Sequence, residues 1–189
     1  MNTARHTIDV CAVLRSAVNQ TYGNLLTRPT GMAVRHQIER ELAAIREGGI
    51  TSLDFSHIGM MDYSCADEVV AKLLVLLEND DLTRGGYVVF LGIGEDHLEL
   101  VESVLKHHGL ALVCMCEGSP QLIGAVSEAE RRAWEMVRLR GRAAPAELAD
   151  EFGFGEDFVA EVLDALSRRR LVRRSSGAYV ALNTVDAVQ

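Results

Sequence analysis

Three side chains that could carry chemistry lie close together in the sequence, His57, Asp62 and Ser64. A serine hydroxyl beside a histidine and a carboxylate is the residue set of a serine hydrolase, whose base must lie within hydrogen-bond reach of the nucleophile. The Gly-x-Ser-x-Gly elbow of one large class of such enzymes is absent around Ser64. The sequence therefore favours a role for this hydroxyl at the start of a helix over a role as a catalytic nucleophile.

The residues before and after Ser64 predict a strand, a short loop and a helix. Leu53 and Phe55 alternate with polar residues, which is the two-residue period of a strand, and the pattern ends at Gly59. We expect the Ser64 side chain to accept hydrogen bonds from the first free backbone N–H groups of the helix. Asp67, three residues on, would then lie at the positive end of the helix dipole.

An amphipathic helix is predicted to follow Ser64 and to end at Asn79. Glu68 and Lys72 fall on its exposed face, and its apolar positions recur at helical spacing, at Ala66, Val69, Val70, Leu73, Leu74 and Leu77. A phosphate at the start of this helix would add a charge of about −1.5 to −2 and change the surface that a partner meets. The predicted partner-binding surface is this loop and first helical turn, and it comprises Asp62, Tyr63, Ser64, Cys65, Asp67 and Glu68.

The segment Met61-Asp62-Tyr63-Ser64-Cys65, which follows a strand ending in Asp54-Phe55-Ser56, resembles the Asp-Ser-Ser-Gly motif of STAS domains. This module occurs in sulfate transporters and in anti-sigma-factor antagonists. Asp62 matches the motif aspartate, and Ser64 matches the serine that is phosphorylated in the regulatory branch. The resemblance therefore implies that Ser64 is a phosphoacceptor. Tyr63 and Cys65 replace the first serine and the glycine, so the resemblance is closer to divergent STAS-like proteins. It covers roughly residues 5 to 118 and implies a partner that is a serine kinase or ATPase of the anti-sigma type.

Strands and helices alternate through the rest of this front part. We predict a strand over Thr7–Leu14, a helix over Met32–Glu47 capped by Thr30, a central strand over Tyr87–Ile93, a helix from Gly94 that Gly109 ends, and a strand over Leu110–Cys116. The residues from Asp9 to Val18 could instead open a helix. Because parallel neighbours need helical crossovers, this order predicts an α/β domain with a mixed sheet that tends toward three layers.

From Ser127 the pattern changes to three helices and a hairpin. We predict a helix from Ser127 to Gly141, a second over Ala144–Phe152, a third marked by Phe158, Val162, Leu163 and Leu166, and a hairpin of Leu171–Arg174 and Ala178–Leu182. This order resembles a winged helix-turn-helix. The candidate DNA-binding residues are Arg168, Arg169, Arg170, Arg173 and Arg174, although the third helix also carries acidic residues where bases are usually read.

Composition and charge limit the classes of function. The net charge of −8 argues against a protein that coats nucleic acid, and the acidity lies in the front part. The four cysteines show no zinc-finger or disulfide-framework spacing, so we expect neither a metal site nor a cofactor. The chain shows neither a membrane-spanning run nor a signal-peptide core, and we expect a cytoplasmic protein without membrane contact.

The sequence thus predicts a STAS-like α/β domain over residues 1–118, a connector over 119–126 and a winged-helix α+β domain over 127–189. Our preferred hypothesis is a non-enzymatic signalling regulator that binds a protein partner at the Ser64 loop and transmits the result through the winged helix. The alternative is a transcription factor that binds DNA directly and uses the front domain as a ligand sensor or dimerisation unit. A homodimer is compatible with both.

Overall fold

The computed structural model describes residues 5–19, 21–45, 48–79 and 86–182. The chain divides into two units, residues 1–125 (unit 1) and residues 126–189 (unit 2). No helix within the described ranges is long and apolar enough to cross a bilayer.

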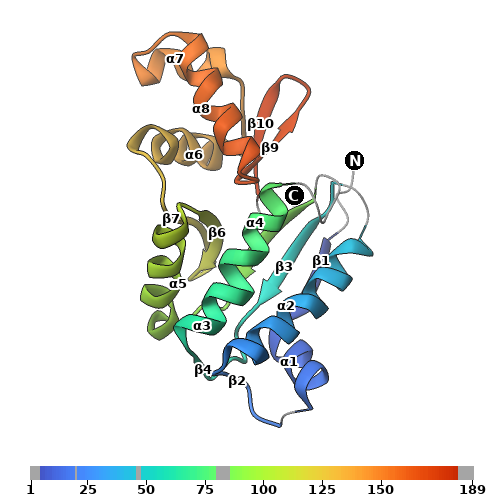
Figure 1. Cartoon of the computed structure of the whole chain (residues 1–189). Helices are drawn as coiled ribbons and strands as arrows, with labels where there is room; N and C mark the ends of the chain where they lie inside the picture. The colour runs from blue at the N-terminus through green and yellow to red at the C-terminus, as the bar shows by residue number, and fades with distance from the viewer. Residues whose placement is uncertain (1–4, 20, 46–47, 80–85, 183–189) are drawn as a thin grey trace. The chain divides into compact units, whose positions relative to one another are not determined.

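A five-stranded mixed sheet forms the framework of unit 1, in the order β1-β3-β5-β6-β7 (Figure 1). Four strands are parallel, β1 (Arg5–Asp9), β3 (Ile50–Asp54), β5 (Tyr87–Leu91) and β6 (Ala111–Cys116), and β7 (Ser119–Gly124) runs antiparallel to β6. The predicted central position of β5 is confirmed. The prediction of a connector over 119–126 is wrong, because most of that segment pairs with β6 as an edge strand.

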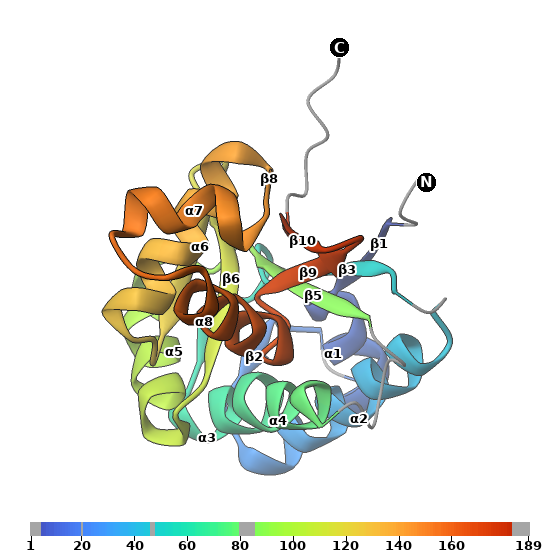
Figure 2. The same cartoon turned by 90° about the horizontal axis from the view of Figure 1, so that it is seen from above.

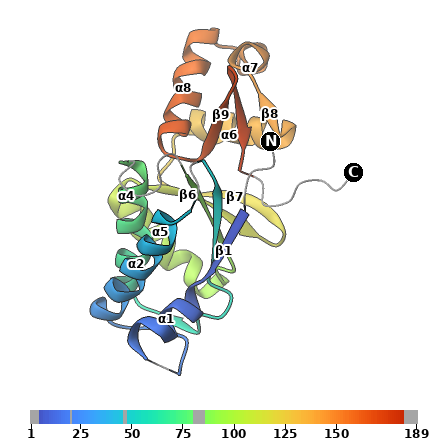
Figure 3. The ribbon, with the colours of Figure 1, turned by 90° about the vertical axis from the view of Figure 1, so that its right-hand side faces the viewer.

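Helices cover one face of this sheet. They are α1 (Val10–Val18), α2 (Arg28–Ala43), α3 (Tyr63–Ala66), a π-helical stretch η1 (Asp67–Lys72), α4 (Leu73–Glu78) and α5 (Glu95–His108). The strand order places every parallel crossover in the same direction, so right-handed connections bring the helices to the same face. Every second strand residue belongs to the core beneath the helices, as Val88 and Phe90 do in β5 and Leu112 and Cys114 do in β6. The expected tendency toward three layers is therefore wrong for the described helices of unit 1, and Figure 3 shows α2 and α4 together on one side of the strands.

Two helix starts differ from the sequence prediction. Asp9 accepts hydrogen bonds from the backbone N–H groups of Cys11 (2.8 Å) and Ala12 (3.1 Å), so the chain enters α1 directly after β1 and the alternative helix reaching Val18 is the correct one. Thr27 rather than Thr30 caps α2, and Pro29 lies in the first turn of that helix, where its missing N–H costs little. The predicted end of this helix, Arg46 and Glu47, lies outside the described residues.

Unit 2 contains three helices and a small sheet. The helices are α6 (Glu128–Arg140), α7 (Pro145–Phe152) and α8 (Glu156–Arg168), and the three-stranded sheet has the order β8-β10-β9 with β8 (Arg142–Ala143), β9 (Val172–Ser175) and β10 (Ala178–Ala181). Ser127 and Glu130 form the capping box that opens α6. Ser176 and Gly177 both have positive φ, which suits the two-residue turn of the predicted hairpin.

Candidate functional site

Asp62, and not Ser64, is the cap of the helix that follows the motif. The Oδ1 atom of Asp62 accepts hydrogen bonds from the backbone N–H of Cys65 and from the hydroxyl of Ser64, both at 2.8 Å. The prediction that Ser64 is the cap is therefore wrong, because its backbone is already helical and its side chain turns back to the aspartate. Ser64 as a residue is half-buried rather than enclosed in the core.

The hydrogen bonds at this cap also set its electrostatics. Partial burial would raise the pKa of Asp62, but the hydrogen bonds from the Cys65 N–H and the Ser64 hydroxyl outweigh burial and hold the pKa below its ordinary value. Asp62 is therefore a carboxylate at neutral pH, fixed within hydrogen-bond distance of the Ser64 oxygen.

Two short paired strands hold the loop in front of Ser64. β2 (Asn24–Leu25) pairs in parallel with β4 (Met60–Met61), and the backbone N–H of Asp62 continues this pairing by donating to the carbonyl of Leu25 at 2.8 Å. The backbone N–H of Gly59 donates to the carbonyl of Gly23 at 2.7 Å. Segments that are more than 30 residues apart in sequence thus fix the approach to the motif.

Exposed apolar side chains gather on these same segments. Met60 and Tyr63 flank Asp62 with exposed fractions of 53% and 41%. Tyr22, Leu26 and Met32, on the segment that pairs with β4 and on the first turns of α2, are exposed as well. We call these five residues the apolar rim of Ser64. Large exposed apolar side chains on segments that pair with one another favour a surface that binds another protein.

Cys65 faces the interior rather than a partner. Its side chain is buried and its thiol donates to the carbonyl of Thr27 at 3.0 Å. Burial and the nearby Asp62 carboxylate raise the pKa of this thiol to about 11, so it stays protonated at neutral pH. A Cβ atom on Gly31 of α2 would come within 3.0 Å of the Cys65 Cα. Gly31 therefore allows α2 to pack closely against the start of the helix at Cys65.

Asp67 and Glu68 are buried, and the prediction that they contribute to an exposed partner surface is wrong. Arg28 donates to both carboxylates at 2.8 Å, and Arg35 donates to Glu68 at 3.3 Å. His108 lies 2.6 Å from Asp67 and Lys72 also binds Glu68. We call these six residues, Arg28, Arg35, Asp67, Glu68, Lys72 and His108, the buried ion cluster.

The shifted titration of both carboxylates follows from this cluster. Burial would raise the pKa of Asp67, but hydrogen bonds from Arg28 and then His108 lower it below its ordinary value. Burial acts in the same direction on Glu68, and hydrogen bonds from Lys72, Arg28 and Arg35 lower the pKa of that group. Both side chains are therefore charged at neutral pH although they lie inside the protein.

The π-helical stretch η1 begins at Asp67, inside the cluster. A π-turn inserts an extra residue into the helical repeat, and such turns often occur at functional positions. Figure 2 shows α3 and α4 running beside α2 as one rod, with η1 as the part that joins them. The sequence pattern assumed an uninterrupted α-helical repeat, and this is why it assigned Glu68 to the solvent face.

His57 is exposed and does not pair with Ser64. Its Nδ1 atom lies 3.4 Å from Oδ2 of Asp9, and the Ser64 hydroxyl donates to Asp62. Among the described residues, no group of three or more histidine, cysteine, aspartate or glutamate side chains is arranged to hold a metal ion.

The five arginines predicted to bind DNA have different surroundings in unit 2. Arg169 forms an ion pair with Glu130 at 3.0 Å, and Arg174 forms one with Asp164 at 3.3 Å. Arg168 is exposed, whereas Arg170 and Arg173 are half-buried. The exposed start of α8 carries Glu156, Asp157 and Glu161 together with Phe158.

The sequence analysis found Asp62 and Ser64 but missed the cations of the buried ion cluster. Arg28 and His108 lie about 40 residues from Asp67, and no local pattern links them. The only available signal was a pair of adjacent carboxylates within an otherwise apolar run. Comparisons of the sequence with protein-family models and with curated proteins found no match.

Proposed function

We propose that the chain is a cytoplasmic signalling regulator, and that unit 1 binds a protein partner at Ser64 and its apolar rim. The observation that carries this proposal is the half-buried Ser64 on a hydrogen-bonded loop that also carries the exposed residues Met60 and Tyr63. A fixed surface with exposed aromatic and methionine side chains is suited to protein contact, since these residue types are enriched at interfaces. The resemblance of the motif to STAS domains supports a serine kinase or ATPase of the anti-sigma type as the partner.

Phosphorylation of Ser64 would act through Asp62. The phosphate would remove the hydroxyl proton that Asp62 accepts and place negative charge close to that carboxylate. Two unit charges about 4 Å apart repel each other by about 1 to 4 kcal/mol near a protein surface, whereas the capping interaction stabilises the helix by about 1 kcal/mol. The repulsion therefore equals or exceeds the capping interaction, and phosphorylation would displace Asp62 and rearrange the surface around Tyr63.

Unit 2 is proposed as the output module, in the manner of a winged helix. The order of three helices with a β8-β10-β9 sheet supports this proposal, because the short strand between α6 and α7 and the terminal hairpin fit that arrangement. The acidic start of α8 and the ion pairs of Arg169 and Arg174 favour protein contact over direct DNA readout.

The test uses four versions of the full chain: wild type, Ser64→Ala, Ser64→Asp and Ser103→Asp. Ser103 is an exposed serine on α5, so its substitution adds the same charge to unit 1 outside the site. Each version is used to capture partners from extracts of the source cells, and the purified pair is then incubated with ATP. We expect a partner that binds wild type, Ser64→Ala and Ser103→Asp, binds Ser64→Asp at least about tenfold more weakly, and transfers phosphate to Ser64.

Mass spectrometry locates the phosphate and titration gives the affinities. Equal affinities of Ser64→Asp and Ser103→Asp would contradict the proposal. Phosphate found only on other residues would contradict the phosphoacceptor role of Ser64.

A further inference from the structure

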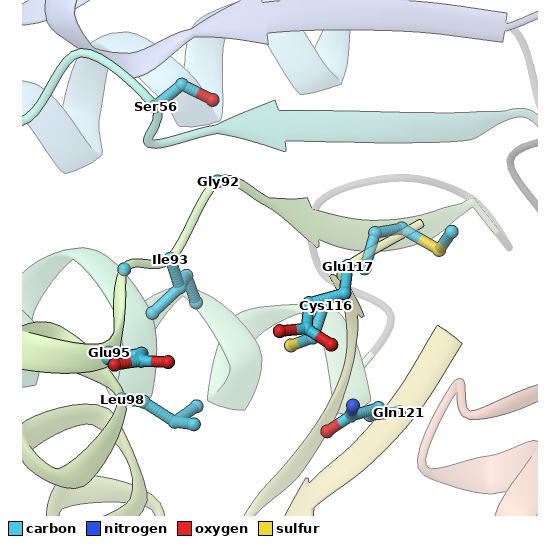
Figure 4. Close-up of a pocket in the computed structure, with 10 residues that line it drawn as sticks. Ser56, Gly92, Ile93, Glu95, Leu98, Cys116, Glu117 and Gln121 are labelled. Atoms are coloured by element: carbon cyan, nitrogen blue, oxygen red, sulfur yellow. The ribbon is translucent and has the colours of Figure 1, made fainter. Parts of the chain in front are cut away.

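A second site candidate lies in unit 1, at the carboxyl ends of strands β3 and β5. A cavity of about 570 Å³ opens there between the loops that follow these strands, the start of α5 and the hairpin of β6 and β7 (Figure 4). Its volume is in the range of pockets that hold small organic ligands. None of its lining residues belongs to the apolar rim or to the buried ion cluster.

The floor of the cavity is a fixed backbone contact. Gly92 has φ of +65°, and a Cβ atom there would come within 2.5 Å of the Ser56 backbone nitrogen and 2.8 Å of its Cα. Only glycine allows the loops after β3 and β5 to approach this closely. Asp54 fixes the other side of the contact, since it accepts hydrogen bonds from the Ser56 N–H at 2.9 Å and from its hydroxyl at 2.6 Å.

Two carboxylates face each other across the opening. Glu95 extends from the first turn of α5 and Glu117 from the turn between β6 and β7, and Figure 4 shows the two exposed residues on opposite sides of the same open space. Neither side chain has an ion-pair partner among the described residues, and none of the residues that line the cavity is lysine or arginine. An anionic ligand would meet two negative charges, whereas a cation would meet complementary charge from both sides.

The remaining wall is largely apolar. Ile93, Leu98 and Met115 are half-buried and line the cavity, and the amide of Gln121 offers both a donor and an acceptor at the rim. An apolar ligand that covers these half-buried side chains would remove their apolar surface from water, which favours binding. Methionine also makes favourable contacts with aromatic rings. The lining thus combines an apolar surface with a negatively charged mouth.

We infer that this cavity binds a small organic cation, an amine carried on an apolar or aromatic group, with Glu95 and Glu117 holding the ammonium. This inference does not depend on the function proposed for Ser64. It assigns to unit 1 a small-molecule site on a different set of loops.

The test compares ligands of equal shape and opposite charge on the full chain. Benzylamine, phenethylamine and tryptamine are titrated by ¹⁵N NMR, each against the carboxylate of matching length: phenylacetate, 3-phenylpropionate and indole-3-propionate. We expect at least one amine to shift the backbone signals of Gly92, Gly94 and Gln121, and to bind at least about fivefold more tightly than its carboxylate counterpart.

Substitutions then assign the charge. Glu95→Gln and Glu117→Gln should each weaken amine binding by about threefold to fivefold, since exposed ion pairs contribute modestly. Glu99→Gln, an exposed site on the same helix outside the cavity, should leave binding unchanged. The inference is overturned if no amine shifts these signals, if the carboxylates bind as tightly as the amines, or if Glu99→Gln weakens binding as much as the two cavity substitutions do.

Discussion

Replacing Glu68 with glutamine removes one negative charge from the buried ion cluster and keeps the size of the side chain. Only 3% of the Glu68 side chain is exposed, and three cations contact it. Removing one partner of a fully buried ion pair costs about 3 to 5 kcal/mol, because the other charge is left without compensation. Arg28 and Lys72 have about half of their side chains in solvent, whereas the side chain of Arg35 is only 13% exposed. Water can therefore solvate two of the three cations, and we expect a loss of about 2 kcal/mol in the free energy of unfolding.

The chain carries separate reporters for its two units. All four cysteines lie in unit 1, and three of them, Cys11, Cys65 and Cys114, are buried, so their reaction with a thiol reagent in urea follows the unfolding of that unit. The single tryptophan, Trp134, is buried in unit 2, where its indole N–H donates to the carbonyl of Leu171 at 3.2 Å. We expect Glu68→Gln to lower the urea midpoint of thiol exposure and to change the tryptophan transition less.

The pH dependence gives an independent check with a definite sign. The folded-state pKa values of Asp67 and Glu68 are lowered, so their contribution to stability is complete above the unfolded-state values of about 4 and is lost as the pH falls through the folded-state values. Between pH 5 and pH 3 the wild-type protein should therefore lose stability more steeply than Glu68→Gln does.

Glu102→Gln is the matched control, since Glu102 forms an exposed ion pair with Lys106 on α5 at 3.1 Å. Loss of this exposed ion pair should lower the free energy of unfolding by about 0.5 kcal/mol or less. If Glu68→Gln costs no more than Glu102→Gln, or if its pH profile matches that of wild type, the assignment of a stabilising buried cluster is refuted.

Two further predictions test the packing beside the motif and the role of unit 2. Gly31→Ala places a methyl group within 3.0 Å of the Cys65 Cα, and the backbone there cannot move aside easily. The free energy of unfolding, measured by thiol exposure, should therefore fall by about 1 to 2 kcal/mol despite the better helix propensity of alanine. Unchanged or increased stability would contradict this prediction. Filter binding with genomic duplex fragments at low and physiological salt should show only non-specific affinity at physiological salt, on the order of 10⁻⁴ to 10⁻⁶ M, and Arg168→Ala should leave it unchanged. Submicromolar binding that Arg168→Ala abolishes would instead support the DNA-binding alternative.

Local signals sufficed where one short segment contains everything that decides its structure. The apolar run of β5 indicated a strand buried on both faces, and the structure places it in the centre of the sheet. Gly109 ends α5 with φ of +67°, a conformation that glycine adopts without strain, so the residue type alone located the end of the helix. Ser127 and Glu130, which lie three residues apart, likewise defined the start of α6 through the hydrogen bonds of their capping box.

Competing local signals were resolved only by the fold. Asp62 and Ser64 are both good capping residues, and intrinsic preferences for such caps differ by too little to choose between them. The pairing of β2 with β4 draws Asp62 into an extended conformation, so the helix begins after it. The same applies to the segment over 119–126, whose weak local pattern became a strand because the edge of β6 was available for pairing.

By itself, therefore, the sequence determined the alternation of strands and helices in unit 1, the helices and hairpin of unit 2, and the identity of Asp62 and Ser64 as neighbours at a helix start. The tertiary structure alone decided that Asp67 and Glu68 are buried, because their charges are tolerable only where Arg28, Arg35 and His108 arrive from distant segments. It also decided that Glu95 and Glu117 share one cavity, since the loops after separate strands meet there. Burial and proximity depend on which surfaces pack together, and that information is spread over the whole chain rather than held in any one segment.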